Sequence, residues 1–424
     1  MMNFSRNAHA NGVFSEGGAR SFERLLYSPH RALDATLDQG ALPRRLLRLF
    51  YPLWRVKVTG RKRVAGDFSE LEWFIVRGIH AGGLTSTAAL AQFFGLEPRF
   101  VGKLVDFLRG IGHIEGDDPL VLTPLGQESF QARVRYQELS EDAWLYFDGL
   151  DSRPLTLEHY AIPVYTNLDV NSSFQALYRF GRHWDTLSLD ALMQHPDRAR
   201  FNLPDEITHI EPPRENDPAA VHIPIYVVER HSQGDAADDM PFFVFSRIRS
   251  LRDMVLEEVV NRDFLTLDTL RLTPAGSLVA AVNDVMARRG LKDDEWYLQP
   301  ESPWGAQVMV DGQAVRRLAR RGSGGEQRLL SARDVGGYLL AYDWCVWLTC
   351  DDAELRHEAA AARLVEWLQF APTLPTAQDL ARRLALLGER LRVPALSSEE
   401  LIEASARQGM TRALERLDAL VIEE

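Results

Sequence analysis

Residues 67–126 carry the clearest structural signal in this chain: DFSELEWFIVRGIHAGGLTSTAALAQFFGLEPRFVGKLVDFLRGIGHIEGDDPLVLTPLG. Ser69, with Glu72 three residues later, has the spacing of a capping box, so it predicts a helix start. The apolar residues that follow recur at helical spacing up to Gly82-Gly83, which predicts the helix end. A second helix is predicted over residues 86–94, before Gly95.

A third helix and a hairpin are predicted next. Pro98 suits a first helical position, and the apolar residues of this helix are Val101, Leu104, Val105 and Leu108. Two short apolar runs then flank a turn at residues 116–119, which is rich in glycine, aspartate and proline. This pattern predicts a β-hairpin.

Three short helices followed by a hairpin are typical of a winged helix-turn-helix. The Leu-Thr-Pro-Leu-Gly ending at residues 122–126 resembles the strand-to-helix exit of bacterial MarR-like regulators. The resemblance covers about sixty of the 424 residues, and no family is recognised for the rest. It implies a module that binds DNA or a protein, with Arg99 and Lys103 of the third helix reaching phosphates or base edges.

The charge pattern argues both for and against DNA. Residues 1–140 contain 18 basic and 14 acidic side chains, whereas the remainder contains 30 and 46. A basic strip precedes the module, and we expect its densest part to support DNA binding through Arg55, Lys57, Arg61, Lys62 and Arg63. The alternative is that these residues solvate one face of a strand. The predicted wing is acidic (Glu115, Asp117 and Asp118), which weakens attraction to phosphates and favours a protein-docking module.

Composition indicates an ordinary globular protein. No apolar run is long enough to cross a bilayer, so no membrane association is expected. Residues 1–20 are polar and lack a secretory core, which predicts a disordered tail. Cys345 and Cys350 are interpreted as buried thiols in a reducing cytoplasm.

The predicted fold class is α+β, and four parts are expected. After the tail, residues 21–140 form the winged-helix domain with an N-terminal extension, residues 141–300 a mixed α+β domain, and residues 301–424 a mainly α C-terminal domain. The extension is predicted to be helical over residues 21–51 and a strand over residues 54–59.

More local expectations concern the rest of the chain. A helix is expected over residues 124–138, and strands over residues 161–165, 222–228, 242–245, 307–310 and 344–350. The loop at residues 231–239 is expected to be a mobile hairpin tip. Leu-Thr-Pro-Ala-Gly at residues 272–276 repeats the earlier motif and raises the idea of a second, partial winged helix.

Two features of the sequence could serve catalysis or ligand binding. Asp351-Asp352 follows a predicted strand, with Glu354, His357 and Glu358 beyond it, so a metal-dependent nuclease or hydrolase could use these carboxylates. The alternative, which we favour, is that they cap the next helix. Four arginines between residues 316 and 321 precede glycines 322–325, but the spacing is not that of a P-loop. No metal or cofactor is expected.

The leading hypothesis is a cytoplasmic winged-helix protein of bacterial type that acts by binding DNA rather than by catalysis. It would be a transcriptional regulator or the DNA-sensing subunit of a larger assembly, such as a phage-defence system. A second hypothesis is an adaptor that docks a protein partner through the winged helix. The acidic domains would bind a protein, a ligand or a second copy of the chain. The third is the hydrolase centred on Asp351 and Asp352.

Overall fold

The computed structural model describes residues 26–166, 175–176, 189–214, 218–231, 241–262, 278–321, 329–371 and 374–422. They form a mixed α+β protein with a large mixed sheet and C-terminal helices. The chain divides into two compact units, and the divisions fall within two long strands. Among the described residues, the first unit contains 51–166 and 189–223, and the second contains 26–50 and most of the chain from 224 onward. Each unit is described by itself.

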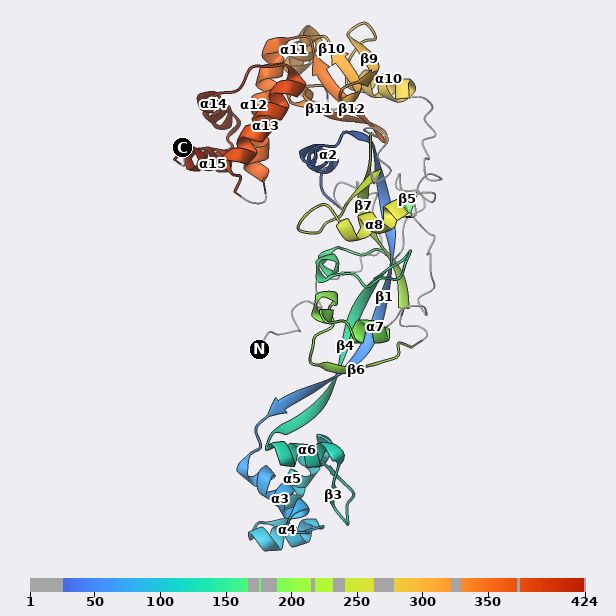
Figure 1. Ribbon diagram of the computed structural model, residues 1–424, viewed down its shortest axis with the longest axis vertical. Coiled ribbons are helices and arrows are strands. Elements are labelled where there is room, and N and C mark those ends of the chain that lie inside the picture. The colour runs from blue at the N-terminus through green and yellow to red at the C-terminus, as the bar shows by residue number, and fades with distance from the viewer. Residues whose placement is uncertain are drawn as a thin grey trace. The chain divides into compact units, whose positions relative to one another are not determined.

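The first unit contains three helices in the order predicted: α3 (Glu70–His80), α4 (Thr87–Phe94) and α5 (Pro98–Gly110). The predicted capping box is present, because Ser69 Oγ accepts from the Glu72 amide and the Glu72 carboxylate accepts from the Ser69 amide. Gly95 ends α4 with a left-handed φ of 66°, a backbone conformation that costs little without a Cβ. The three helices lie together in Figure 1, and their buried apolar residues form a common core.

The predicted hairpin follows α5. Strands β2 (Ile114–Glu115) and β3 (Val121–Leu122) pair antiparallel. The Leu120 amide donates to the Thr85 carbonyl, so the hairpin is held against the start of α4. Thr123 then caps α6 (Pro124–Ala132) by accepting from the Gly126 amide. Residues 67–134, which hold α3 to α6 and the hairpin, are called the helical module below.

Two predictions around the module are wrong. The helix predicted over residues 21–51 is only α2 (Pro29–Asp38), and residues from Pro43 onward belong to the long strand β1 (Pro43–Gly66). The helix predicted to reach residue 138 ends at Ala132, because Arg133 turns left-handed with φ 55°. Strand β4 (Arg135–Asp148) starts there and pairs antiparallel with β1 from Gly66↔Arg135 to Leu53↔Asp148. Cross-strand pairing outweighs local helical periodicity in both places.

The module therefore lies at the end of the β1–β4 ribbon (Figure 1). Further along β1, β6 (Ile207–Glu211) pairs on its other side. Apolar residues of β1 and β4 form a core there with α7 (Leu189–Met193) and the 3-10 helix η4 (Arg198–Phe201). The strand predicted at residues 161–165 is wrong: the 3-10 helix η2 (Leu157–Ala161) occupies its start, and only Tyr165 makes a bridge, to His222.

The second unit contains the sheet order β8-β7-β1-β12-β10-β9. The predicted hairpin of β7 (Pro218–Arg230) and β8 (Phe242–Phe245) is confirmed, and α8 (Met254–Arg262) follows. Residues 232–240 of its loop lie outside the described residues, as do the repeated motif at 272–276, the glycines at 322–325 and the tail at 1–20. Strand β5 (Gln175–Ala176) also pairs with β1.

Two successive hairpin-helix units follow α10 (Leu278–Arg288). The first consists of β9 (Trp296–Ser302), β10 (Gly305–Val310) and α11 (Gly312–Arg321). After the 3-10 helix η5 (Ala332–Asp334), the second consists of β11 (Gly337–Ala341), β12 (Trp344–Cys350) and α12 (Ala353–Phe370). Strands β10 and β12 pair in parallel, so the two hairpins form one sheet. Cys345 and Cys350 are free and buried in β12, as expected.

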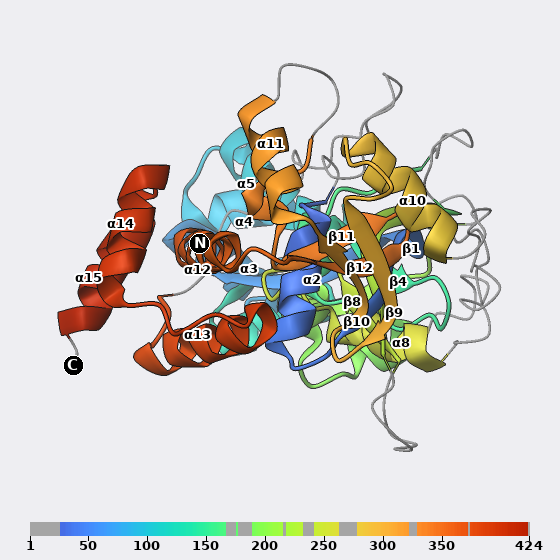
Figure 2. The same ribbon diagram turned by 90° about the horizontal axis from the view of Figure 1, so that it is seen from above.

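The C-terminal helices α13 (Ala377–Leu391), α14 (Ser398–Gln408) and α15 (Thr411–Ile422) gather around α12 (Figure 2). Ser397 and Glu400 form the predicted capping signal at the start of α14. The four-part division of the chain stays a prediction.

Candidate interaction surfaces of the helical module

Helix α5 exposes a polar stripe and an apolar flank beside it. Arg99, Lys103 and Asp106 recur at intervals of four and three residues and are exposed, so they share one stripe. Neither Arg99 nor Lys103 forms an ion pair among the residues that the structure describes. These two predicted contact residues are therefore brought together on one helix face with their charges available.

The hairpin is attached to α5 through Arg109. One Arg109 nitrogen lies 2.8 Å from Asp106 Oδ1, and the other donates to the Gly116 carbonyl at 2.9 Å and lies 3.0 Å from Asp117 Oδ1. No ion pair of Glu115 or Asp118 is found among the described residues. The hairpin next to the polar stripe thus remains acidic, as the sequence indicated.

The basic strip of β1 is neutralised by carboxylates. Its cations pair across the ribbon with β4 and β6: Lys57 with Asp142 at 2.7 Å, Arg61 with Glu211 at 2.8 Å, and Lys62 with Glu141. The Lys57 and Thr59 hydrogen bonds lower the pKa of Asp142, so this carboxylate stays ionised. The structure does not gather the strip into a surface of free positive charge.

The other two strip residues are also engaged. The Arg55 guanidinium lies 4.0 Å from the centre of the Trp144 ring, a cation–π contact. Arg63 lies 2.8 Å from Glu128 of α6 and 3.7 Å from Glu138 of β4. Of the acidic partners on β4, Glu138 lies in the segment expected to be helical, so residue spacing does not place it beside this strip.

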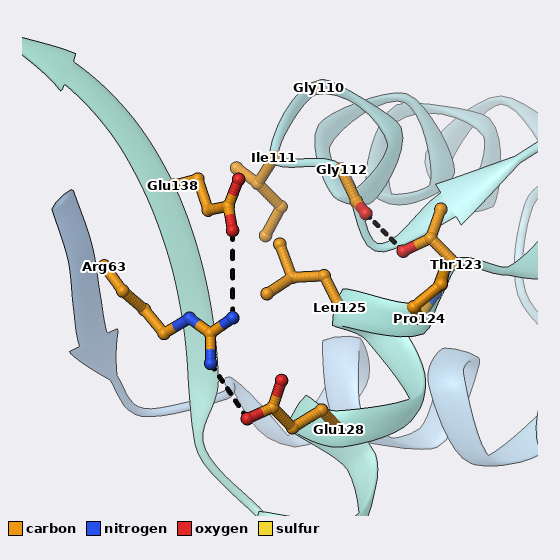
Figure 3. Close-up of a pocket in the computed structure, with 9 residues that line it drawn as sticks. All are labelled: Arg63, Gly110, Ile111, Gly112, Thr123, Pro124, Leu125, Glu128 and Glu138. Atoms are coloured by element: carbon orange, nitrogen blue, oxygen red, sulfur yellow. Dashed lines mark hydrogen bonds and ion pairs between the residues drawn. The ribbon is translucent and has the colours of Figure 1, made fainter. Parts of the chain in front are cut away.

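A cleft of about 500 Å³ lies where the module meets the ribbon (Figure 3). It is lined by the end of α5, the start of α6 and the ribbon residues Arg63 and Glu138. Figure 3 shows the Arg63 side chain between the Glu128 and Glu138 carboxylates, so its charged groups bind one another. The cleft therefore offers no unpaired charge to a ligand.

A buried histidine ties the module to β4. His113 is fully buried, and its Nε2 lies 2.5 Å from the Tyr136 carbonyl, to which a neutral ring donates. Burial, more than any neighbouring charge, lowers its pKa, so the ring is neutral at pH 7. His113 is a structural link and contributes no positive charge to the module.

The module as a whole is acidic. Residues 67–134 contain nine Asp and Glu but only five Lys and Arg, a net charge of −4. With the basic strip paired, the module's cations that form no ion pair among the described residues are Arg77, Arg99, Lys103 and Arg133. The net negative charge of the module disfavours binding to the phosphate backbone of DNA.

Large apolar side chains are exposed on the module, and the helical spacing of apolar residues did not predict this exposure. Phe93 is 68% exposed, and four others are 39–44% exposed: Leu71, Phe74, Phe100 and Phe107. Phe94 joins two of them, because its ring centre lies 6.2 Å from that of Phe74 and 5.0 Å from that of Phe93. Two adjacent phenylalanines, Phe93 and Phe94, cannot both face the core from one helix, so the sequence alone indicates that one of them is exposed.

These side chains lie along one flank of α3, along one flank of α5 and at the end of α4. Phe100, partly buried Leu104 and Phe107 follow one flank of α5, and Leu71 and Phe74 follow one flank of α3. Arg135 pairs with Glu72 of α3 at 3.2 Å, and its guanidinium lies 5.5 Å from the Phe107 ring centre, so this arginine links α3 to the flank of α5 that carries Phe107. We call Leu71, Phe74, Phe93, Phe100 and Phe107 the phenylalanine surface.

The candidate catalytic aspartates have structural partners. Asp351 Oδ1 accepts from the Gly312 amide at 2.7 Å. Asp352 caps α12 by accepting from the Glu354 and Leu355 amides, and it pairs with Arg316 at 2.9 Å. No group of three metal-binding side chains occurs within the described ranges.

The surrounding candidates are also engaged. His357 Nε2 lies 2.9 Å from Glu400, and Arg317 pairs with Glu295 at 2.7 Å. The side chains of Arg320 and Arg321 and the glycines that follow lie outside the described residues.

Comparisons with known proteins give no relatives. No protein-family model matches the chain, and neither does any curated protein or solved structure. In the part of the chain that the structure describes, no helix is both long and apolar enough to cross a membrane.

Proposed function

We propose that the helical module is a winged helix that docks a protein partner, and that the chain is an adaptor. The observation that carries this proposal is the phenylalanine surface on an acidic module whose neighbouring cations are already paired. A partner segment with an apolar face and basic flanking residues, such as an amphipathic helix, fits this chemistry.

The winged-helix assignment rests on element order and pairing. Helices α3, α4 and α5 share one core, and the β2–β3 hairpin and α6 follow directly. The hairpin is attached to α5 by Arg109 and to the start of α4 by a backbone hydrogen bond. This arrangement supports the resemblance seen in residues 67–126.

The area of the phenylalanine surface supports a protein partner. A phenylalanine side chain buries roughly 150–250 Å² when it is covered. Together, the five partly exposed side chains present several hundred Å² of apolar area, which is the range of patches that mark interaction sites. Aromatic residues at the centre of a protein–protein interface often contribute most of the binding free energy.

The test places a photo-crosslinking phenylalanine analogue at position 107 in the full chain, inside cells of the natural host. A protein that forms a discrete adduct is identified and purified. Its affinity for the wild type and for a Phe74→Ser/Phe107→Ser variant is then measured by titration calorimetry. We expect the variant to bind at least about 100-fold more weakly, because two anchoring rings are lost.

The matched control is Phe370→Ser, a similarly exposed phenylalanine outside the module. Its affinity for the partner should equal that of the wild type. Circular dichroism verifies that both variants fold. Equal affinity of the partner for the wild type and the double variant would show that the phenylalanine surface is not the docking site.

A second candidate function is DNA binding by the polar stripe of α5. It is favoured by one observation: Arg99 and Lys103 are exposed and make no ion pair among the described residues. In a winged helix this helix would enter the major groove. The regulator and DNA-sensing roles belong to this candidate. Duplex binding across a salt series separates it from the docking proposal.

A further inference from the structure

Arg390 of α13 is a buried cation that lacks a hydrogen-bond acceptor among the described residues. Its side chain is 6% exposed, and it makes no hydrogen bond or ion pair with any residue that the structure describes. Its Nε is fully enclosed and unsatisfied. A buried guanidinium normally has acceptors for its N–H groups, because removing it from water without them is unfavourable.

Other arginines in the second unit show this rule at work. Arg363 donates to the carbonyls of Val335, Arg333 and Asp334. Arg416, as buried as Arg390, donates to the carbonyls of Leu368 and Ala371. Arg383 of α13 pairs with Asp38. Arg390 therefore differs from these three arginines, each of which has an oxygen acceptor.

Arg390 is surrounded by aromatic rings and by a second hydrogen-bond donor that lacks an acceptor. Its guanidinium carbon lies 5.2 Å from the centre of the Trp304 ring and 5.9 Å from that of Trp347. Tyr338, beside Trp347, donates its hydroxyl hydrogen to the Trp304 carbonyl, so this oxygen is engaged. The Trp347 Nε1 is buried and also unpartnered. Two buried donors thus lack an acceptor at one place.

Nearby charges do not compensate Arg390. Burial is the main cause that lowers its pKa, and the charge of Arg383 lowers it further, whereas Tyr338, Asp34 and Glu389 act in the opposite direction. None of these acids forms an ion pair with it. Ring faces attract a cation but supply no acceptor for its N–H groups. The surroundings favour an added negative charge.

We propose that Arg390 and the Trp347 Nε1 form a binding site for a small oxyanion, either a phosphate group or a carboxylate. Both ligands accept parallel hydrogen bonds from a guanidinium and would satisfy the unpartnered donors. Trp304 and Trp347 would form its apolar walls. The site lies in the second unit, and it is independent of the docking proposed for the module.

The experiment titrates the full-length protein with inorganic phosphate and, separately, with acetate, against chloride at equal ionic strength and pH 7. Calorimetry measures binding, and tryptophan fluorescence and the melting temperature are followed in parallel. We expect one oxyanion to bind saturably, to raise the melting temperature and to change the emission of the tryptophans. The responding probe identifies the ligand as a phosphate or a carboxylate.

Arg390→Met preserves side-chain length and apolar contacts while removing the donors. It should weaken oxyanion binding at least tenfold, whereas Arg382→Met, an exposed control on the same helix, should bind as the wild type does. A wild type that binds neither probe overturns the proposal, whatever the variants do. Unchanged binding by a folded Arg390→Met protein overturns it too. If Arg390→Met fails to fold, Arg390→Lys takes its place, with the same weakening expected.

Discussion

Asp148 shows what a single buried carboxylate does in the first unit. It is fully buried at the end of β4, where Tyr51 Oη donates to its Oδ2 at 2.7 Å. The amides of Leu150 and Asp151 donate to its Oδ1 at 2.7 and 3.0 Å. Burial raises its pKa to about 6 in spite of these hydrogen bonds. The side chain therefore holds the turn after β4, but burying its ionised form lowers the free energy of unfolding as pH rises.

This cost predicts the pH dependence of an Asp148→Asn variant. The folded protein holds the Asp148 proton more tightly than the unfolded chain, whose Asp titrates near 3.8. The contribution of this group to stability is complete below pH 3.8 and is lost as pH rises through about 6. The stability of Asp148→Asn relative to wild type should rise by up to about 3 kcal/mol across this window.

Urea denaturation of both proteins between pH 4 and 8, at low protein concentration, measures this difference. The control is Asp197→Asn, an exposed aspartate of the same unit, for which the difference should stay flat. A flat profile for Asp148→Asn as well would mean that the carboxylate is solvated in the native protein.

At the scale of elements, the β1–β4 ribbon explains why the basic side chains of β1 are paired with carboxylates. Fourteen residues of β4 pair in register with β1, which sets Lys57 near Asp142 and Lys62 near Glu141. The positive charges of one strand therefore meet the negative charges of its neighbour. The ribbon is an arm that carries the module, stabilised by cross-strand pairs.

The pair of Lys57 and Asp142 can be measured by a double-mutant cycle. Lys57→Gln, Asp142→Asn and the double variant are compared by denaturation. Both side chains are about half exposed, so the coupling should be only about 0.2–1 kcal/mol. A cycle between Lys103 and Asp142, which are not paired, should give no coupling. Lack of coupling in the first cycle as well would mean that Lys57 is free to meet a phosphate.

At the scale of the whole molecule, charge decides which macromolecule the chain can approach. The net charge is −12, and the helical module itself is acidic. Lys and Arg must neutralise phosphates for DNA binding, and only Arg99 and Lys103 are free among the predicted contacts. The whole chain should therefore repel a duplex at physiological salt.

Fluorescence anisotropy with a mixed-sequence duplex tests this over a salt series up to about 0.15 M, a physiological ionic strength. We expect no binding by the wild type at that salt, and the same result for Arg99→Glu/Lys103→Glu. Binding that weakens steeply with salt and disappears in the double variant would instead establish the polar stripe as a DNA-binding surface.

The sequence by itself determined the local structure of residues 67–126. The Ser69–Glu72 capping box, the stop at Gly95 and the turn at residues 116–119 are encoded within a few residues of each other, so spacing alone predicts them. The same holds for Asp352 as the cap of α12. These features were predicted because their physics is local.

Only the tertiary structure decided which charges and apolar groups are free. Residues 43–50 look helical in isolation but form the start of strand β1, which pairs with β12 at Arg45 and with β4 from Leu53 onward. The partners of Arg61 and Arg63 lie 150 and 65 residues away in the chain. Exposure of Phe93 and isolation of Arg390 likewise depend on how distant elements pack. Long-range pairing and burial, which residue spacing does not contain, therefore define the candidate sites.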